Sequence, residues 1–160
     1  MLNLILHCIK SNMKIVRTNS EHNDFINLVK ELDAYLKITD QDEHDFYNQF
    51  NNIDVIKYVV IAYYKEQPVG CGAIKYFNEN SLEVKRMFVT PEARGKGFAK
   101  EILQELEFWA KELGYKNCIL ETGKRQVEAV KFYHKCKYKV IPNYGQYANM
   151  KNSICFKKVL

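Results

Sequence analysis

The sequence lacks the paired cysteines of a disulfide framework or a zinc site. It has five cysteines, far apart in the chain and without a C-x-x-C pair: Cys8, Cys71, Cys118, Cys136 and Cys155. An odd, scattered set of this kind is typical of reduced thiols in the cytosol. We therefore expect a cytoplasmic protein without structural disulfides.

No segment is rich in glycine, serine or proline as interdomain linkers are, and no internal repeat is present. A chain of 160 residues is expected to fold as one domain with a single core. An apolar patch lies within residues 1–12, but it is too short to cross a bilayer and no basic segment precedes it. We expect a poorly ordered extension over 1–12, ahead of a natural start at Met13, and one domain over 13–160 with no membrane partner.

The charge balance is only mildly basic, with a formal net charge of +5. Such an excess suits a polyanionic small molecule as well as a nucleic acid. The chain has no basic helix and no aromatic strand of the RNA-binding type, and its lysines are scattered. A nucleic-acid-binding domain is therefore the weaker interpretation.

Hydrophobic periodicity predicts an ordered series of strands and helices. Strands are predicted at 14–18, 58–64, 69–77, 82–89, 118–122, 138–141 and 154–159. Helices are predicted from Phe25 to Leu36, from Asp40 through Phe46, Tyr47 and Phe50, from Ala99 to Leu113 before a stop at Gly114, and from Gln126 to Lys135. The strands between 58 and 89 form an antiparallel meander. The order predicts an α/β (α+β) domain with a mixed, mostly antiparallel sheet of about six to seven strands and about four helices.

The strand that begins at Leu82 changes its hydrophobic phase. Apolar residues fall on even positions at Leu82 and Val84 but on odd positions at Met87 and Val89. Period-two alternation shifts where a residue is inserted, so the pattern indicates a β-bulge around Lys85–Arg86. A strand buried on both faces, without a bulge, explains the same residues.

Two glycines stand where this strand gives way to the long helix. Glycine in a helix costs about 1 kcal/mol relative to alanine, so Gly95 and Gly97 suggest that bare backbone is needed there. The N–H groups would lie at the positive end of the helix beside Arg94 and Lys96, which suits a pyrophosphate. The segment is neither a P-loop nor a G-x-G-x-x-G fingerprint. An ordinary tight turn is the alternative.

The same segment carries a family resemblance. "RGKGFA" (94–99) resembles the R/Q-x-x-G-x-G/A motif of the GNAT superfamily of acetyl-CoA-dependent N-acetyltransferases. "EVKRMFVTPEARGKGFAKEIL" (83–103) is similar to the family's fourth strand and third helix, and "LETGKRQVEAVKFYHKCKYKVI" (120–141) to its fifth strand, fourth helix and sixth strand. The element order agrees from about Met13 to Leu160. The chain is identified as a member of this superfamily, and the GNAT fold is expected.

The resemblance implies that acetyl-CoA lies between the diverging fourth and fifth strands. Loop amides would bind its pyrophosphate, strand backbone would pair with pantetheine, and the bulge would offer an N–H to the thioester carbonyl. The residues implied to contact acetyl-CoA are Met87, Phe88, Val89, Arg94, Gly95, Lys96, Gly97, Phe98, Ala99 and Gln126. No metal is implied.

Two positions depart from the family pattern. Lys137 stands before Tyr138 where relatives usually have glycine before an aromatic residue, which predicts a tighter or strained turn away from the chemistry. Gln126 stands where many relatives have asparagine at the start of the fourth helix, which puts one pantetheine contact in doubt.

Direct transfer of an acetyl group needs a base for the amine and a proton donor for the thiolate. Tyr133 occupies the position where the family's fourth helix carries a tyrosine beside the cofactor sulfur, and we predict it to be the general acid. Periodicity alone places it in a buried stripe. Glu83 resembles the glutamate base of histone acetyltransferases in this superfamily and is the predicted base. The alternative is a sheet-surface carboxylate paired with Lys85 or with a cross-strand partner.

Three further side chains are weaker candidates. Glu121 is a lesser candidate for the base, or a partner of a neighbouring lysine, and His44 in an exposed acidic helix is a lesser candidate for a substrate contact. Direct attack needs no covalent intermediate. Cys71 is the least improbable nucleophile, but a packed thiol is its expected role.

Acidic residues crowd the segment that covers the acceptor side in this superfamily. They are Asp33, Asp40, Asp42, Glu43 and Asp45. An acidic rim raises the local concentration of amines, so we expect a small cationic acceptor, although a solvated helix face explains the same residues. A non-catalytic acyl-CoA-binding module is the main alternative to an enzyme. The chain is expected to be a monomer or a homodimer.

Overall fold

The computed structural model describes residues 12–49, 52–53 and 56–160. The expectations for residues 1–11, which include Cys8, and for Phe50 lie outside these ranges. Strands are β1 (Met13–Thr18), β2 (Tyr58–Tyr64), β3 (Gln67–Asn78), β4 (Ser81–Val89), β5 (Asn117–Gly123), β6 (Lys139–Ile141) and β7 (Ser153–Val159). Helices are α2 (Asn23–Asp40), α3 (His44–Asn48), α4 (Phe98–Glu112) and α5 (Val127–Lys135), with short 3₁₀ turns η1 (Gln41–Glu43), η2 (Pro91–Ala93) and η3 (Gly145–Tyr147).

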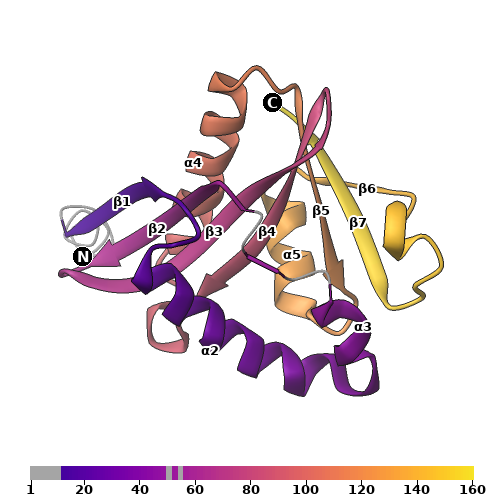
Figure 1. Ribbon diagram of the computed structural model, residues 1–160, viewed down its shortest axis with the longest axis horizontal. Helices are drawn as coiled ribbons and strands as arrows, with labels where there is room; N and C mark the ends of the chain where they lie inside the picture. The colour runs from indigo at the N-terminus through magenta and orange to yellow at the C-terminus, as the bar shows by residue number, and fades with distance from the viewer. Residues whose placement is uncertain (1–11, 50–51, 54–55) are drawn as a thin grey trace.

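The strands form one mixed sheet in the order β1-β2-β3-β4-β5-β7-β6 (Figure 1). Only β4 and β5 pair in parallel, and the other neighbouring strands of this sheet are antiparallel. The predicted meander of β2, β3 and β4 and the mostly antiparallel sheet are confirmed.

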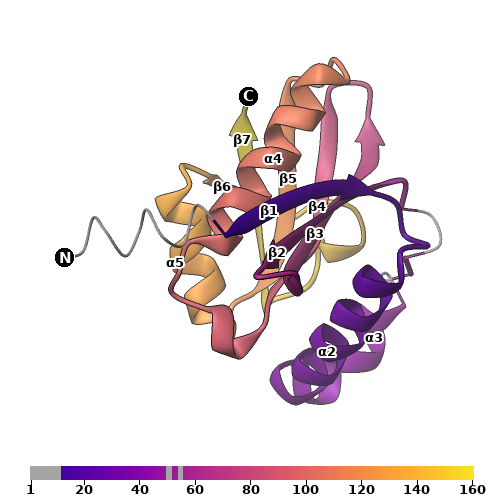
Figure 2. The same cartoon turned by 90° about the vertical axis from the view of Figure 1, so that its left-hand side faces the viewer.

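Helices cover both faces of the sheet (Figure 2). On one face α4 buries Phe98, Ile102, Leu103 and Leu106, which join sheet residues and Tyr133 of α5 in one core cluster. These positions recur at helical spacing, so one side of α4 is apolar throughout. The helix ends before Gly114, whose φ of 89° is the left-handed conformation that glycine adopts easily.

On the opposite face α2 buries an apolar stripe of Phe25, Leu28, Val29 and Leu32 against β2, β3 and β4. The expectation that Asp40 starts the next helix is wrong. Asp40 is the last residue of α2, and the next helix, α3, begins at His44 after a 3₁₀ turn. Apolar residues at helical spacing do not locate this break, since η1 continues the helical path for one turn.

The β-bulge of β4 is confirmed at Arg86. Cys71 of β3 pairs with Phe88, whereas Ala73 pairs with Lys85, so Gly72 opposes two residues of β4. Arg86 has a φ of 58°, the left-handed conformation that inserts the extra residue. The strand also has buried residues on both faces at its start, so both features suggested by its sequence are present.

Within the described residues no helix is long and apolar enough to span a membrane.

Candidate active site

The parallel pairing of β4 and β5 is short and gives way to a gap. It joins Ser81–Glu83 to Asn117–Ile119, and no further β4–β5 pair is formed by the described residues. Figure 1 shows the two strands diverging from this point, with α5 behind the opening. A cavity lies in the gap, lined by residues of both strands, α2, α3, α5 and η3. Divergence leaves one edge of β4 available to a ligand.

The loop between β4 and α4 presents bare backbone at the N-terminus of that helix. Gly95 and Gly97 have φ values of 75° and 90°, and a Cβ at either position would meet no atom within 4 Å. Gly97 is the N-cap and supplies no side-chain cap. Within the described part of the chain, the N–H groups of residues 95–99 have no backbone acceptor. They are therefore available to an anion, and the helix dipole favours one there.

The side chains of this loop are partly engaged by the protein. The Nε of Arg94 donates to the carbonyl oxygen of Val89 at 3.1 Å, and the Nζ of Lys96 donates to that of Glu92 at 2.8 Å. Phe98 is 1% exposed and packs in the core, so only its N–H can face a ligand. Exposed backbone, rather than side chains, dominates the surface of the loop.

The register of β4 decides which of its backbone groups face the gap. The N–H of Thr90 donates to Val69 of β3 at 2.9 Å. Because antiparallel pairs alternate, Phe88 also bonds to β3, while Val89 faces the gap. Met87 follows the bulge and lines the cavity. Of the three predicted backbone contacts, Phe88 is therefore turned away from the opening.

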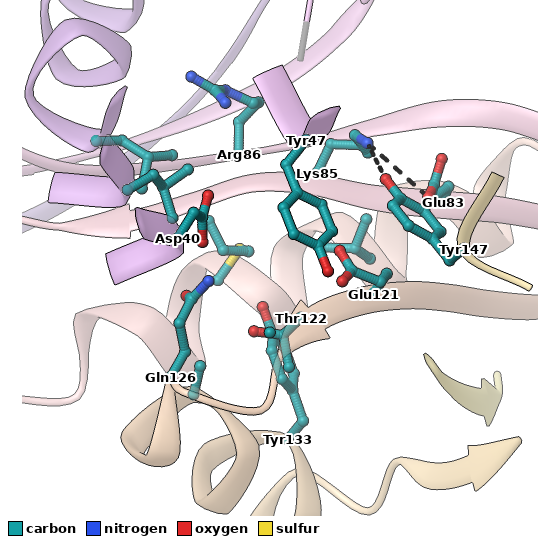
Figure 3. A pocket seen from close by; sticks show the side chains of 16 residues that line it. Asp40, Tyr47, Glu83, Lys85, Arg86, Glu121, Thr122, Gln126, Tyr133 and Tyr147 are labelled. Carbon is teal, nitrogen blue, oxygen red and sulfur yellow. Dashed lines mark hydrogen bonds and ion pairs between the residues drawn. The ribbon is translucent and has the colours of Figure 1, made fainter. Parts of the chain in front are cut away.

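Tyr133 of α5 is both a core residue and part of the cavity wall. Its ring contacts those of Phe132, Tyr138 and Phe156, and it is 7% exposed. Figure 3 shows the side chain rising from α5 toward the cavity. Burial raises the pKa of its phenol above the usual value, so the group stays protonated at neutral pH. Gln126, the N-cap of α5, also lines the cavity.

The α2-side chamber is the part of the cavity lined by Asp40, Tyr47, Glu83, Lys85, Glu121 and Tyr147. Glu83 accepts a hydrogen bond from the hydroxyl of Tyr144 at 2.9 Å, and its Oε1 lies 4.0 Å from the Nζ of Lys85. The Nζ of Lys85 lies 3.3 Å from the Tyr147 hydroxyl (Figure 3). Burial lowers the pKa of Lys85, and the charge of Glu83 opposes that shift. Glu83 is therefore held in a network rather than exposed on the sheet.

Glu121 stands opposite, on β5, with a different environment. Its Oε1 is buried and has no hydrogen-bond partner among the described residues. Burial raises the pKa of its carboxyl to about 7, although Ser153 and Lys85 favour the charged form. The Tyr47 hydroxyl lies 2.9 Å from the Ser153 hydroxyl, which ties α3 to β7 beside this carboxylate.

The predicted acidic rim is only partly directed into the cavity. Asp33 is paired with the guanidinium of Arg86. Glu43 accepts hydrogen bonds from Asn152 and Arg125. Of the predicted rim residues, Asp40 alone lines the cavity, where burial raises its pKa. Asp42 and Asp45 are exposed.

Two other candidates, Cys71 and His44, do not line the cavity. Cys71 is buried, its thiol lies 3.5 Å from the carbonyl oxygen of Arg86, and burial raises its pKa to about 12. It is a packed thiol, as expected. His44 is half-buried at the start of α3 rather than exposed, and it does not line the cavity.

Sequence reasoning missed the residues that η3 and β7 contribute. Tyr144, Tyr147 and Ser153 complete the network around the two glutamates. They come from a segment between two short strands, and no periodicity connects that segment with β4. The three tyrosines spaced through 138–147 were the available signal, but aromatic residues of this kind are equally common in cores.

Comparison with known proteins agrees with this geometry. A family model described as "Acetyltransferase (GNAT) family" matches residues 25–138. A protein of Azospirillum brasilense described as "IAA acetyltransferase" is 31% identical over 159 residues, spanning 93% of this chain and 99% of the relative. The chain belongs to the GNAT acetyltransferase family. The "Uncharacterized N-acetyltransferase YsnE" of Bacillus subtilis (strain 168) is 30% identical to this GNAT protein over 101 residues, 62% of this chain and 67% of that one.

Solved structures give the same fold. A putative acyl-CoA N-acyltransferase from Klebsiella pneumoniae is similar to this GNAT protein with a TM-score of 0.77 and 26% identity, covering 92% of this chain and 97% of that one. The PaiA N-acetyltransferase from Thermoplasma acidophilum, solved in complex with coenzyme A, has a TM-score of 0.69 at 19% identity over 92% of this chain and 99% of that one. The predicted family and fold are confirmed.

Proposed function

We propose that the protein transfers the acetyl group of acetyl-CoA to a primary amine by direct attack in a ternary complex. The observation that carries this proposal is the gap between β4 and β5 together with the glycine loop that follows β4, whose N–H groups lack backbone acceptors among the described residues. A pyrophosphate fits there because the space next to Gly95 and Gly97 is open and the helix N-terminus is positive. Membership of an acetyltransferase family supports the same conclusion.

The free edge of β4 suits the pantetheine arm. Val89 faces the gap, and Met87 lines it directly after the bulge. An extended chain carrying amides can add to such an edge as a strand would. The bulge at Arg86 interrupts the ladder with β3, and a backbone N–H released from the ladder would polarise the thioester carbonyl.

Tyr133 is the proposed proton donor for the thiolate that leaves. Its phenol lines the cavity and stays protonated at neutral pH. A thiolate with an ordinary pKa of about 8.5 accepts a hydrogen bond from a phenol and then its proton as the C–S bond breaks. Gln126 is the proposed side-chain contact to the pantetheine arm, because it lines the same side of the cavity.

The state of the cysteine thiols favours direct attack by the amine over a route through an acetylated cysteine. Burial raises the pKa of Cys71 to about 12 and that of Cys155 to about 11. A nucleophilic cysteine needs a thiolate at working pH. Neither thiol provides one.

The acceptor is proposed to be a cationic amine. The cavity is faced by three carboxylates, those of Asp40, Glu83 and Glu121. Lys85 partly balances their negative charge, whereas the charge of Arg86 is paired with that of Asp33. Asp42 and Asp45 extend the negative charge over exposed positions outside the cavity. Such a field favours a positive ligand over a negative one.

An amine panel tests this function. The protein would be incubated with acetyl-CoA and spermidine, an amino acid amide, a simple alkylamine, glutamate or a short peptide, and release of free CoA would be followed. We expect amine-dependent CoA release, highest for spermidine or another cationic amine. Release with none of the amines, despite acetyl-CoA binding by calorimetry, would favour the acyl-CoA-binding module. Release with glutamate alone would contradict the cationic acceptor.

A further inference from the structure

Two glutamates face the α2-side chamber from neighbouring strands, Glu83 from β4 and Glu121 from β5. We propose that Glu121, and not Glu83, is the general base that takes the proton from the acceptor amine. The inference rests on the proposed function and assigns a further residue of the same site.

Glu83 already has partners. Its Oε1 accepts the Tyr144 hydroxyl at 2.9 Å and lies 4.0 Å from the Nζ of Lys85. The residue is 6% exposed, and Lys85 is similarly enclosed. A carboxylate oxygen that already accepts a hydrogen bond and faces a buried ammonium is engaged by the protein itself. Glu83 therefore serves as the counter-charge of Lys85.

Glu121 has an oxygen that the protein leaves unsatisfied. Its Oε1 has no hydrogen-bond partner among the described residues, although it is buried. Buried oxygens without a donor are rare and costly, and they deserve an explanation. The residue as a whole is half-buried and lines the cavity. An amine that enters the cavity supplies the missing donor, directly or through one water molecule.

Charges and hydroxyls face Glu121 from each element around the chamber. Glu83 and Asp40 raise its pKa, while Lys85 and a hydrogen bond with Ser153 lower it. Burial is the largest influence and raises the pKa to about 7. The remaining titratable neighbours are Tyr47 of α3, Tyr133 of α5, Tyr147 of η3 and Cys155 of β7. A base with this pKa is half-deprotonated at neutral pH, where general base catalysis is most effective.

The position also suits the order of proton transfers. Figure 3 shows the Glu121 carboxylate beside the hydroxyl of Tyr47, with Tyr133 below it on α5, whereas the guanidinium of Arg86 points away from it. Glu121 takes one proton from the ammonium of the acceptor, and the nitrogen lone pair then forms the N–C bond. When the C–S bond breaks, the thiolate takes the proton of Tyr133, and Tyr133 recovers one from the new amide nitrogen. The proton on Glu121 passes to solvent, so the reaction releases one proton for each ammonium consumed.

The test is the pH dependence of kcat with saturating acetyl-CoA and the best amine of the panel. The wild-type kcat is expected to rise through about pH 7. Glu121→Gln is expected to lose this rise and about 10²-fold of kcat at pH 8. Glu83→Gln is expected to keep the rise but to move it to lower pH, because the charge of Glu83 raises the pKa of Glu121. Glu121→Asp keeps a carboxylate and should keep the rise at a lower kcat.

The outcomes distinguish failure of Glu121 as the base from failure of the proposed acetyltransferase function. A Glu121→Gln variant that binds acetyl-CoA normally and keeps the wild-type rise overturns the inference, as does loss of the rise in Glu83→Gln alone. If Glu121→Gln does not fold, loss of the rise in folded Glu121→Asp overturns it equally. Absence of amine-dependent CoA release by the wild-type protein is a failure of the proposed function itself, and it is seen before any variant is made.

Discussion

The loop at residues 95–99 follows β4 in the chain, and the α2-side chamber lies in the gap between β4 and β5, but the two offer a ligand different things. The loop offers backbone N–H groups in open space, with two glycines in the left-handed conformation. The chamber offers buried and half-buried side chains from five elements, among them three carboxylates and an ammonium. A substitution at the loop should therefore affect ligand binding by adding a side chain where the ligand lies. A substitution in the chamber should act by changing charge and proton affinity.

This difference separates the two halves of the proposed reaction. Backbone dipoles fixed by a helix keep their strength at every pH and do not titrate. The chamber depends on carboxyl groups whose pKa burial has raised. We infer that the loop determines the affinity for acetyl-CoA, and that the chamber determines the pH range and the acceptor.

The largest effect is expected at Tyr133, which lines the same cavity as the chamber residues. Tyr133→Phe keeps the ring in its aromatic cluster and removes the proposed proton donor. We expect kcat to fall by about 10²-fold, equivalent to about 2.7 kcal/mol, with acetyl-CoA affinity unchanged.

Tyr138→Phe is the matched control. Its ring lies 5.8 Å from that of Tyr133, but it does not line the cavity. Steady-state kinetics should show a normal kcat for this control. Normal turnover by Tyr133→Phe would leave solvent as the proton source.

The next largest effect concerns the pH dependence of stability, and it tests whether a carboxyl group of the chamber titrates near neutral pH. The pKa of Glu121 is about 7 in the folded protein against a usual 4.5. The folded state therefore binds this proton more tightly, and stability from this group is lost as pH rises from about 4.5 through 7. Glu121→Gln abolishes that loss. The free energy of unfolding of the variant, taken relative to wild type, should therefore be higher at pH 8 than at pH 5 by about 1 to 2 kcal/mol.

Urea unfolding at both pH values measures this gain, and Glu128→Gln is the control. Glu128 is a highly exposed carboxylate on α5, paired with Lys131. Its replacement should give the same difference from wild type at both pH values. If Glu121→Gln also gave the same difference from wild type at both pH values, the raised pKa of Glu121 would be contradicted.

A smaller effect is expected at the loop. Gly97→Val places a side chain in the space proposed for phosphate oxygens, and acetyl-CoA affinity should fall at least about tenfold, or 1.4 kcal/mol. Gly114→Val is matched to it, since Gly114 lies at the other end of α4 with φ of 89° and also has open space around it. Calorimetry should show normal affinity for Gly114→Val. Equal losses in both variants would assign the effect to backbone strain.

The smallest effect lies outside both regions. Lys137 has a φ of 68° at the turn between α5 and β6, a conformation in which a side chain is strained. Lys137→Gly should raise the free energy of unfolding by about 0.5 to 1 kcal/mol and leave kcat unchanged. Lys137→Ala, which removes the same charge but keeps the Cβ, should give no such gain in urea unfolding.

The fold and the loop were predictable because their signals are local. The continuous apolar run of β2, the alternating run of β4 and the helical stripe of α4 each reflect their own element, and the glycines mark where β4 gives way to α4. The phase change at Met87 even located the bulge. The strained turn at Lys137, anticipated as a departure from the family pattern, likewise lies within one segment.

The chamber was predictable only in part, because its residues are brought together by tertiary structure. Glu83 and Glu121 were both candidates, but their roles depend on partners that lie far along the chain, such as Tyr144 and Ser153. The acidic segment around Asp40 indicated a negative rim, yet neutralisation of Asp33 by Arg86 depends on the left-handed bulge. Spacing in one dimension does not encode such contacts.

The most direct test of the account is an amide NMR titration with acetyl-CoA. We expect large shifts of the N–H signals of residues 95–99 as the ligand binds, because these groups would donate to phosphate oxygens. The N–H of Gly114, at the opposite end of the same helix, should stay unchanged. Binding that leaves the signals of residues 95–99 in place would contradict the claim that the glycine loop holds the ligand.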